Sequence, residues 1–241
     1  MQAGTPGAAS SENGLVPVFR ILTLTTVASI FALIALGGAV RLTNSGLGCP
    51  DWPLCHGGLL PPLETHPVIE YSHRMMASVV GLLMLATTLS VWRWYRRNPW
   101  LTIAATTGLV MLGVQVILGG VTVLTELSGE MVLAHLAVAE ALMAVMLVVC
   151  VASWRGYGSV PDQSTAVAGP RHFGLLALAG ALLVYGLLLT GSYVTVSGAT
   201  AACGTAWPLC HGELIPQGHL AIMHMVHRLL ALVSGVLVVV V

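Results

Sequence analysis

The sequence is short of charge. Charged residues make up only 7% of the 241 residues and lysine is absent, whereas hydrophobic residues make up 56% and the mean hydropathy is +0.90. A water-soluble domain could not keep so apolar a chain in solution. The composition therefore indicates an integral membrane protein of the all-α class.

Apolar stretches of about 20 residues, the length of a membrane-spanning helix, are the main organising feature. They occur at 17–40, 69–92, 101–125, 131–153, 173–196 and 219–241. The first 16 residues lack the basic start of a cleaved signal peptide, so we expect a flexible cytoplasmic tail there. Six of the nine arginines fall on one side of the predicted topology, and by the positive-inside bias that side is cytoplasmic; they are Arg20, Arg93, Arg96, Arg97, Arg155 and Arg171.

The segment WPLCHG occurs twice, at 52–57 and at 207–212. Downstream, Glu70, His73 and Arg74 lie 154 residues before His224, His227 and Arg228. Agreement between imperfect copies predicts tandem four-helix bundles related by internal duplication. The first half spans 17–153, a cytoplasmic linker spans 154–171, and 172–241 supplies the first two helices of the second half. Two further helices are expected, so we interpret the chain as a fragment of a longer product.

Four of the five cysteines fall in loops on the predicted outer face of the membrane. Because that side of a bacterial envelope is oxidising, we predict two disulfides, Cys49–Cys55 and Cys203–Cys210. Free thiols or a metal site are the alternatives. The spacing within each pair does not match the shorter spacing usual for structural zinc.

Ionisable groups within the apolar stretches are few, and each needs a partner or a role because its charge is costly in lipid. Glu70 and His73 share a helix face, and His135 lies at a similar depth on the fourth helix. Two histidines on facing helices of an apolar bundle are suited to bis-imidazole ligation of haem iron. A hydrogen-bonded structural histidine is the alternative for each residue alone.

The two halves differ in their charged groups. Arg74 and Arg228 are suited to pairing with haem propionates, although an arginine that reaches the membrane interface explains them equally well. Glu70 stands where the second copy has His224, so we expect two unequal pockets. Its carboxylate is a candidate for proton transfer, with an ordinary ion pair to Arg74 or His73 as the alternative.

Several segments together resemble the haem A synthase family. They are GGAVRLTNSGLGCPDWPLCHG at 37–57, IEYSHR at 69–74, the single His135, and the second WPLCHG followed by HMVHR. The resemblance implies oxidation of the C8 methyl group of haem O to a formyl group, which yields haem A for cytochrome oxidase. It assigns Glu70 as the essential acid, His73 and His135 as ligands in the first half, and His227 as one ligand of a haem b in the second half. The other ligand of that haem would lie in an eighth helix.

The resemblance also implies partners. Haem O synthase, the protohaem farnesyltransferase, would supply the substrate, and an electron donor that the sequence does not identify would complete the reaction. Membrane lipid surrounds the chain, a homo-oligomer is compatible with the sequence, and no nucleic acid is expected. The alternative function is a bis-histidine b-type cytochrome that only transfers electrons, and such a carrier does not require Glu70.

Overall fold

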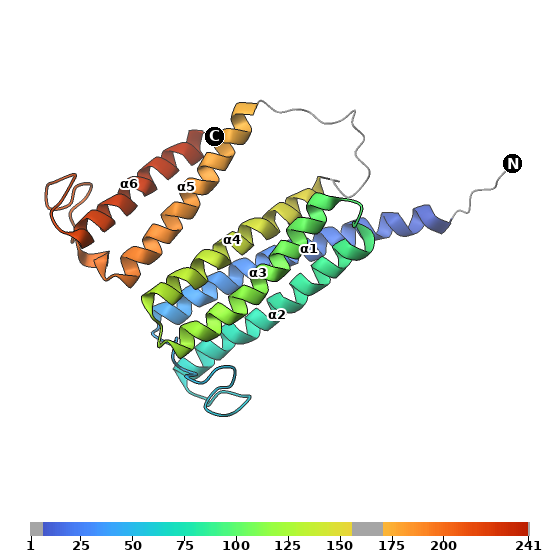
Figure 1. Ribbon diagram of the computed structural model, residues 1–241, viewed down its shortest axis with the longest axis horizontal. Helices are drawn as coiled ribbons and strands as arrows, with labels where there is room; N and C mark the ends of the chain where they lie inside the picture. The colour runs from blue at the N-terminus through green and yellow to red at the C-terminus, as the bar shows by residue number, and fades with distance from the viewer. Residues whose placement is uncertain (1–6, 156–170, 241) are drawn as a thin grey trace. The chain divides into compact units, whose positions relative to one another are not determined.

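The computed structural model describes residues 7–155 and 171–240 and shows an all-helical chain (Figure 1). In these ranges the long helices are α1 (Gly7–Leu42), α2 (Thr65–Trp94), α3 (Pro99–Leu124), α4 (Gly129–Trp154), α5 (Arg171–Val196) and α6 (His219–Val240). A short 3-10 helix, η2 (Ala199–Ala201), follows α5, and no β-strand occurs among the described residues. All six long helices contain stretches apolar enough to cross a membrane. The chain is therefore an all-α, multi-pass membrane protein, as the sequence predicted.

Helix α1 begins earlier than predicted. It starts at Gly7, so residues 7–16, which were expected in a flexible tail, are helical. Apolar stretches mark only the membrane-crossing part of a helix, whereas a helix needs only consecutive backbone hydrogen bonds and can continue through a polar segment. Residues 1–6 of the tail and 156–170 of the predicted linker lie outside the described ranges.

The chain divides into two compact units. The first contains α1, α2, α3 and the part of α4 from Val138 onward, and the second contains residues 128–137, α5 and α6. This division differs from the predicted halves in one respect, because the first turns of α4 group with α5 and α6. The halves at 17–153 and 172–241 remain a prediction about repeat boundaries.

The first unit has an apolar core between its helices. The core is formed by Val27, Ile30, Val80, Met84, Leu142, Met146 and Cys150. A Cβ atom on Gly108 of α3 would lie only 2.8 Å from the Met146 sulfur, so the glycine permits this close packing. Small residues allow helices in a membrane to approach closely, and packing is a main source of their association.

Buried hydroxyl groups also join the helices of the first unit. Thr26 of α1 and Thr87 of α2 are 3.0 Å apart through their hydroxyl oxygens, and Thr23 and Ser153 form the same contact at 3.0 Å between α1 and α4. Arg20 donates to the Ser153 carbonyl at 3.2 Å, near the end of α4. Polar groups within lipid need such internal partners.

The second unit is built on the packing of α5 against α6. The Tyr185 hydroxyl donates to the Ala137 carbonyl at 3.1 Å and thereby attaches α5 to the first turns of α4. A smaller buried cluster joins the loop between α5 and α6 to α6. It contains Cys203 and Cys210 of the loop and Ala221 and Met225 of α6. The loop is thus packed onto the first turns of α6.

We predict that Met84→Ala lowers the free energy of unfolding by about 2–5 kcal/mol, because the Met84 side chain is fully buried and its loss leaves a cavity. Unfolding in mixed micelles of increasing denaturing detergent measures this change. Leu82→Ala is the control, since Leu82 lies on the same helix and is 70% exposed. Equal effects of the two substitutions would show that this core does not stabilise the bundle.

Candidate functional site

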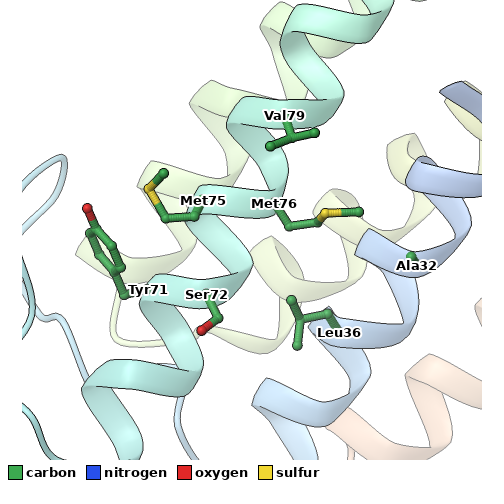
Figure 2. Close-up of a pocket in the computed structure, with 7 residues that line it drawn as sticks. All are labelled: Ala32, Leu36, Tyr71, Ser72, Met75, Met76 and Val79. Carbon is green, nitrogen blue, oxygen red and sulfur yellow. The ribbon is translucent and has the colours of Figure 1, made fainter. Parts of the chain in front are cut away.

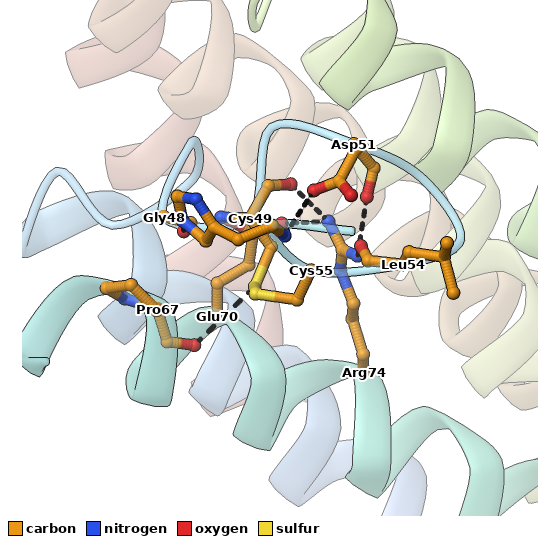
Figure 3. A network of polar contacts seen from close by, with 9 residues as sticks. Gly48, Cys49, Asp51, Leu54, Cys55, Pro67, Glu70 and Arg74 are labelled. Carbon is orange, nitrogen blue, oxygen red and sulfur yellow. Dashed lines mark hydrogen bonds and ion pairs between the residues drawn. A yellow bond between two sulfur atoms is a disulfide. The ribbon is translucent and has the colours of Figure 1, made fainter. Parts of the chain in front are cut away.

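The loop between α1 and α2 is held on the first turns of α2 (Figure 3). The disulfide Cys49–Cys55 closes a small ring in this loop and confirms the predicted pairing. The Cys49 N–H donates to the Glu70 carboxylate at 2.8 Å, and Glu70 is only 4% exposed. The candidate catalytic acid is therefore buried and bonded directly to the disulfide ring.

The guanidinium group of Arg74 is surrounded by hydrogen-bond acceptors from Glu70 and from the backbone of the same loop (Figure 3). Its Nη2 lies 2.5 Å from Glu70 Oε1 and 2.7 Å from the Cys49 carbonyl oxygen, and its Nη1 lies 2.7 Å from the Leu54 carbonyl oxygen and 3.4 Å from that of Asp51. The sequence suggested a haem propionate or Glu70 as the partner of this arginine. In the structure the partners are Glu70 and the loop backbone.

Asp51 stabilises the turn that follows Cys55. Its carboxylate oxygens accept from the backbone N–H groups of His56 and Gly57, both at 2.6 Å. Both residues have a positive φ, 52° and 75°, in the left-handed region. The hydrogen bond from Gly57 is the main cause that lowers the pKa of Asp51 below its ordinary value; desolvation opposes it, and the hydrogen bond from His56 lowers the pKa further. His56 also donates from Nε2 to the Gly48 carbonyl at 2.8 Å.

Trp52 connects the same loop to α3. A Cβ atom on Gly120 would lie 2.8 Å from Cδ2 of the Trp52 indole, so the ring lies directly on the α3 backbone. The peptide bond from Trp52 to Pro53 is cis, as is the one from Trp207 to Pro208 in the second loop. Trp207 is much more exposed, at 80% against 39% for Trp52.

The loop between α5 and α6 has the same local structure as the first loop. It contains the second predicted disulfide, Cys203–Cys210. Arg228 donates to the Ala206 carbonyl at 2.6 Å and to that of Leu209 at 3.4 Å, as Arg74 does in the first loop. His211 lies 3.0 Å from the Ala202 carbonyl through Nε2, which repeats the contact of His56. These matched contacts support the interpretation that the two loops are copies within an internally repeated sequence.

The second loop lacks both acids that hold the first. Ala206 stands at the position of Asp51, and His224 stands at that of Glu70. The Nδ1 atom of His224 is buried and has no hydrogen-bond partner among the described residues. The two loops thus share a backbone arrangement but differ in charge.

Each unit also seats a histidine against a glycine. A Cβ atom on Gly37 of α1 would lie 3.1 Å from Cε1 of His73, and one on Gly191 of α5 would lie 2.9 Å from Cε1 of His227. Each glycine precedes its histidine by 36 residues. Sequence reasoning missed this pair, although both glycines obey the 154-residue offset of the repeat. A side chain at Gly191 would force the imidazole to shift, and one at Gly37 would crowd it by a few tenths of an ångström.

Two ionisable residues of α4 each have a buried polar atom that has no hydrogen-bond partner among the described residues. His135 lies in the α4 segment that belongs to the second unit, whereas His73 belongs to the first, so their pairing stays a prediction. The Nδ1 atom of His135 is buried with no hydrogen-bond partner among the described residues. The same holds for Oε2 of Glu140, farther along α4.

A hollow of about 440 Å³ lies between α1 and α2 (Figure 2). It is lined by Ala32, Leu36, Tyr71, Ser72, Met75, Met76 and Val79. The hydroxyl of Tyr71 donates to the Leu59 carbonyl at 2.8 Å, and that of Ser72 donates to the Val68 carbonyl at 2.7 Å. With both hydroxyls bonded, this surface is suited to hydrocarbon.

Comparison with known sequences assigns the chain to a family. The model of the family described as cytochrome oxidase assembly protein, COX15-CtaA, matches residues 20–68 and 63–241. The chain belongs to this family. The match includes both disulfide loops and both glycine seats, so the paired features described above lie within the part shared with the family.

Individual relatives agree with this assignment. A heme A synthase from Exiguobacterium sp. is 32% identical over 76% of this chain and 59% of its own length. A heme A synthase from Exiguobacterium sibiricum is 32% identical over 84% of this chain and 67% of its own length. A heme A synthase from Symbiobacterium thermophilum is 31% identical over 91% of this chain and 72% of its own length. The chain spans about three fifths of the length of the first of these relatives.

We predict that Arg74→Gln loosens the first loop. Breaking a buried ion pair while leaving one charge unpaired costs about 3–5 kcal/mol, so the Cys49–Cys55 disulfide should be reduced at least tenfold faster by a water-soluble phosphine. Mass spectrometry of alkylated peptides measures the rate for each disulfide. Cys203–Cys210 is the internal control, because Arg74 does not contact it. Unchanged reduction of the first ring would show that Arg74 does not hold the loop.

Because the pKa of Asp51 is lowered, we predict that the turn it stabilises loses stability only at acidic pH. A depressed pKa in the folded state contributes stability above the unfolded pKa, and this contribution is lost as the pH falls through the folded value, which lies below 3.8. We expect the His56 and Gly57 amides to lose protection from hydrogen exchange in that range, after correction for intrinsic rates. Asp51→Asn should lower protection already at neutral pH and remove the acid transition. A transition that persists in Asp51→Asn would assign it to another group.

Proposed function

We propose that this chain is the haem-binding part of a haem A synthase, which oxidises the C8 methyl group of haem O to a formyl group. The proposal is supported by membership in the family, by relatives that carry this name, and by a shared observation in both units. That observation, a helix-borne histidine seated against a glycine, carries the proposal. The reaction replaces two C–H bonds by a C=O bond, so it must remove protons and electrons and supply an oxygen atom.

The residues present fit a haem. An axial ligand needs an imidazole held in one orientation, and the Gly37 and Gly191 seats restrict the rings of His73 and His227. Helices of an apolar membrane bundle provide the apolar enclosure that a porphyrin requires. We propose His73, His135 and His227 as iron ligands, with a haem b held through His227. Bound haem supplies the redox chemistry, and the protein supplies orientation and exclusion of water.

For Arg74 and Arg228 we propose a role different from direct contact with haem propionates. Both guanidinium groups donate hydrogen bonds to loop carbonyls, and in Arg74 both Nη atoms do so. The two arginines would therefore act by holding the disulfide loops on α2 and α6.

Glu70 is the proposed catalytic acid, and its contacts restrict how it could act. One oxygen accepts a hydrogen bond from Arg74 and the other accepts one from the Cys49 N–H. Each oxygen has a second lone-pair site that a proton donor can use. The loop that contains the disulfide covers the carboxylate and thus restricts the direction from which such a donor could approach.

The same contacts favour one alternative function. If Glu70 serves only to hold the loop, the chain needs no catalytic acid and is a bis-histidine b-type cytochrome that transfers electrons. Both functions require His73, His135 and His227 and differ at Glu70. The product of the reaction therefore discriminates between them.

We further propose an orientation and partners. The arginine distribution supports a cytoplasmic N-terminus and disulfide loops on the outer face of the cell membrane. Haem O synthase would deliver the substrate, a separate electron acceptor or donor would complete the redox balance, and a homo-oligomer is compatible with the surface exposed to lipid.

The ligands are tested by His73→Ala, His135→Ala and His227→Ala in the full chain, purified from cells that make haem O. Each substitution should lower haem affinity by about tenfold or more, measured by absorbance and by mass analysis of extracted haem. His219→Ala is the control, because His219 is exposed and carries no proposed role. Haem content that equals the wild-type value in all three variants would contradict the proposed ligands.

Glu70→Gln tests the reaction. We expect this variant to bind haem but to contain no haem A or hydroxylated intermediate, whereas Glu64→Gln, a change at an exposed loop acid, should behave as the wild type. Wild-type protein that contains haem B alone under these conditions would favour the electron carrier. An unchanged yield of haem A in Glu70→Gln would reject the catalytic assignment.

A further inference from the structure

The seat of His227 contains a hydroxyl group that the seat of His73 lacks. Thr190 precedes Gly191 on α5, and its Oγ1 atom lies 3.1 Å from Nδ1 of His227. At the matching position on α1, before Gly37, the chain has Leu36, which cannot form a hydrogen bond through its side chain. The difference lies within two otherwise equivalent arrangements.

The Thr190 hydroxyl has one proton and two neighbours that could accept it. One is the Leu187 carbonyl at 3.0 Å, and the other is Nδ1 of His227. With the proton bonded to the carbonyl, the Thr190 oxygen accepts from His227. In that arrangement the proton of the imidazole lies on Nδ1, and the lone pair of the neutral ring lies on Nε2.

This arrangement prepares Nε2 for coordination. A neutral imidazole binds a metal through its unprotonated nitrogen, and a hydrogen bond from the other nitrogen fixes the ring and raises its basicity. Gly191 gives the ring its place on α5, and Thr190 sets which nitrogen remains free. The two neighbouring residues control position and tautomer separately.

We propose that Thr190 is a positioning residue that fixes the Nδ1-protonated tautomer of His227 and makes it a more basic axial ligand, so that the haem of the second unit has a lower reduction potential than it would have without this hydroxyl. The inference rests on the proposed function, because it requires His227 to bind haem iron. A more basic ligand stabilises ferric over ferrous iron, which lowers the potential. The two units thereby differ in the ligand environment on α5 and α1 as well as at Glu70 and His224.

The tautomer is tested first without haem. Nitrogen-15 NMR of haem-free full chain with labelled histidine distinguishes protonated Nδ1 from protonated Nε2, and His227→Gln assigns the signal. We expect protonated Nδ1 in the wild type and in Thr190→Ser, and a mixture of tautomers in Thr190→Val, which has nearly the same shape without the hydroxyl. Protonated Nε2 in the wild type, or the same tautomer in Thr190→Val, would overturn the inference whether or not the chain binds haem.

The electronic effect is tested with haem b added to the full chain. The haem that His227→Ala loses is identified by its spectrum, and its potential is then compared among the variants. Thr190→Val should shift the ferric–ferrous equilibrium about tenfold toward ferrous haem, which corresponds to about 59 mV for one electron, and Thr190→Ser should restore the wild-type value. Leu36→Thr is the matched control and should leave this potential unchanged.

The outcomes separate the two proposals. If His227→Ala loses no haem, the proposed ligand is wrong, while the tautomer result still stands by itself. If His227→Ala loses a haem but Thr190→Val keeps its potential and affinity, the ligand is supported and the role of Thr190 is rejected. A loss of helical content in Thr190→Val would leave Thr190→Ser and the wild-type tautomer as the deciding measurements.

Discussion

The hydrogen bonds of the Arg74 guanidinium group are the interactions on which the loop between α1 and α2 depends for its position. They join a buried carboxylate, a disulfide ring and the loop backbone on two turns of α2. A chain with so few charges cannot leave such a group without partners in a medium of low dielectric constant. If the loop moved away, Glu70 would lose the hydrogen bond from the Cys49 N–H. The loop and the carboxylate are therefore stable together and unfavourable apart.

The second loop shows which part of this design is shared. Arg228 contacts backbone carbonyls as Arg74 does, and the disulfide and the imidazole contact to the backbone recur. The shared contacts involve backbone acceptors, which do not depend on side-chain identity. The two acids, Asp51 in the loop and Glu70 on α2, occur in the first unit only. The two units thus have a common frame with different electrostatics, and Thr190 extends the difference to the histidine seats.

Much of the fold could be predicted from the sequence, because long apolar stretches form helices in lipid whatever their neighbours. The disulfides could also be predicted, since each pair is close in sequence and lies in a long loop. The partners of Arg74 could not, because backbone carbonyls leave no trace in a pattern of side chains. The Gly37 and Gly191 seats were visible in the repeat but gained meaning only once α1 was seen to pack on α2 and α5 on α6. The start of α1 was missed because its first turns are polar.

The contact of Trp52 with Gly120 has a mechanical consequence. The first loop is fastened to α2 by Arg74 and rests on α3 through the indole ring, so three consecutive elements of the chain meet at one small ring closed by a disulfide. The indole lies on the α3 backbone at Gly120, and the Cys49 N–H of the same ring bonds to Glu70 on α2. A displacement of this end of α3 relative to α2 would therefore have to break or shift one of these contacts. The loop is in this sense a link between two helices as well as a connection along the chain.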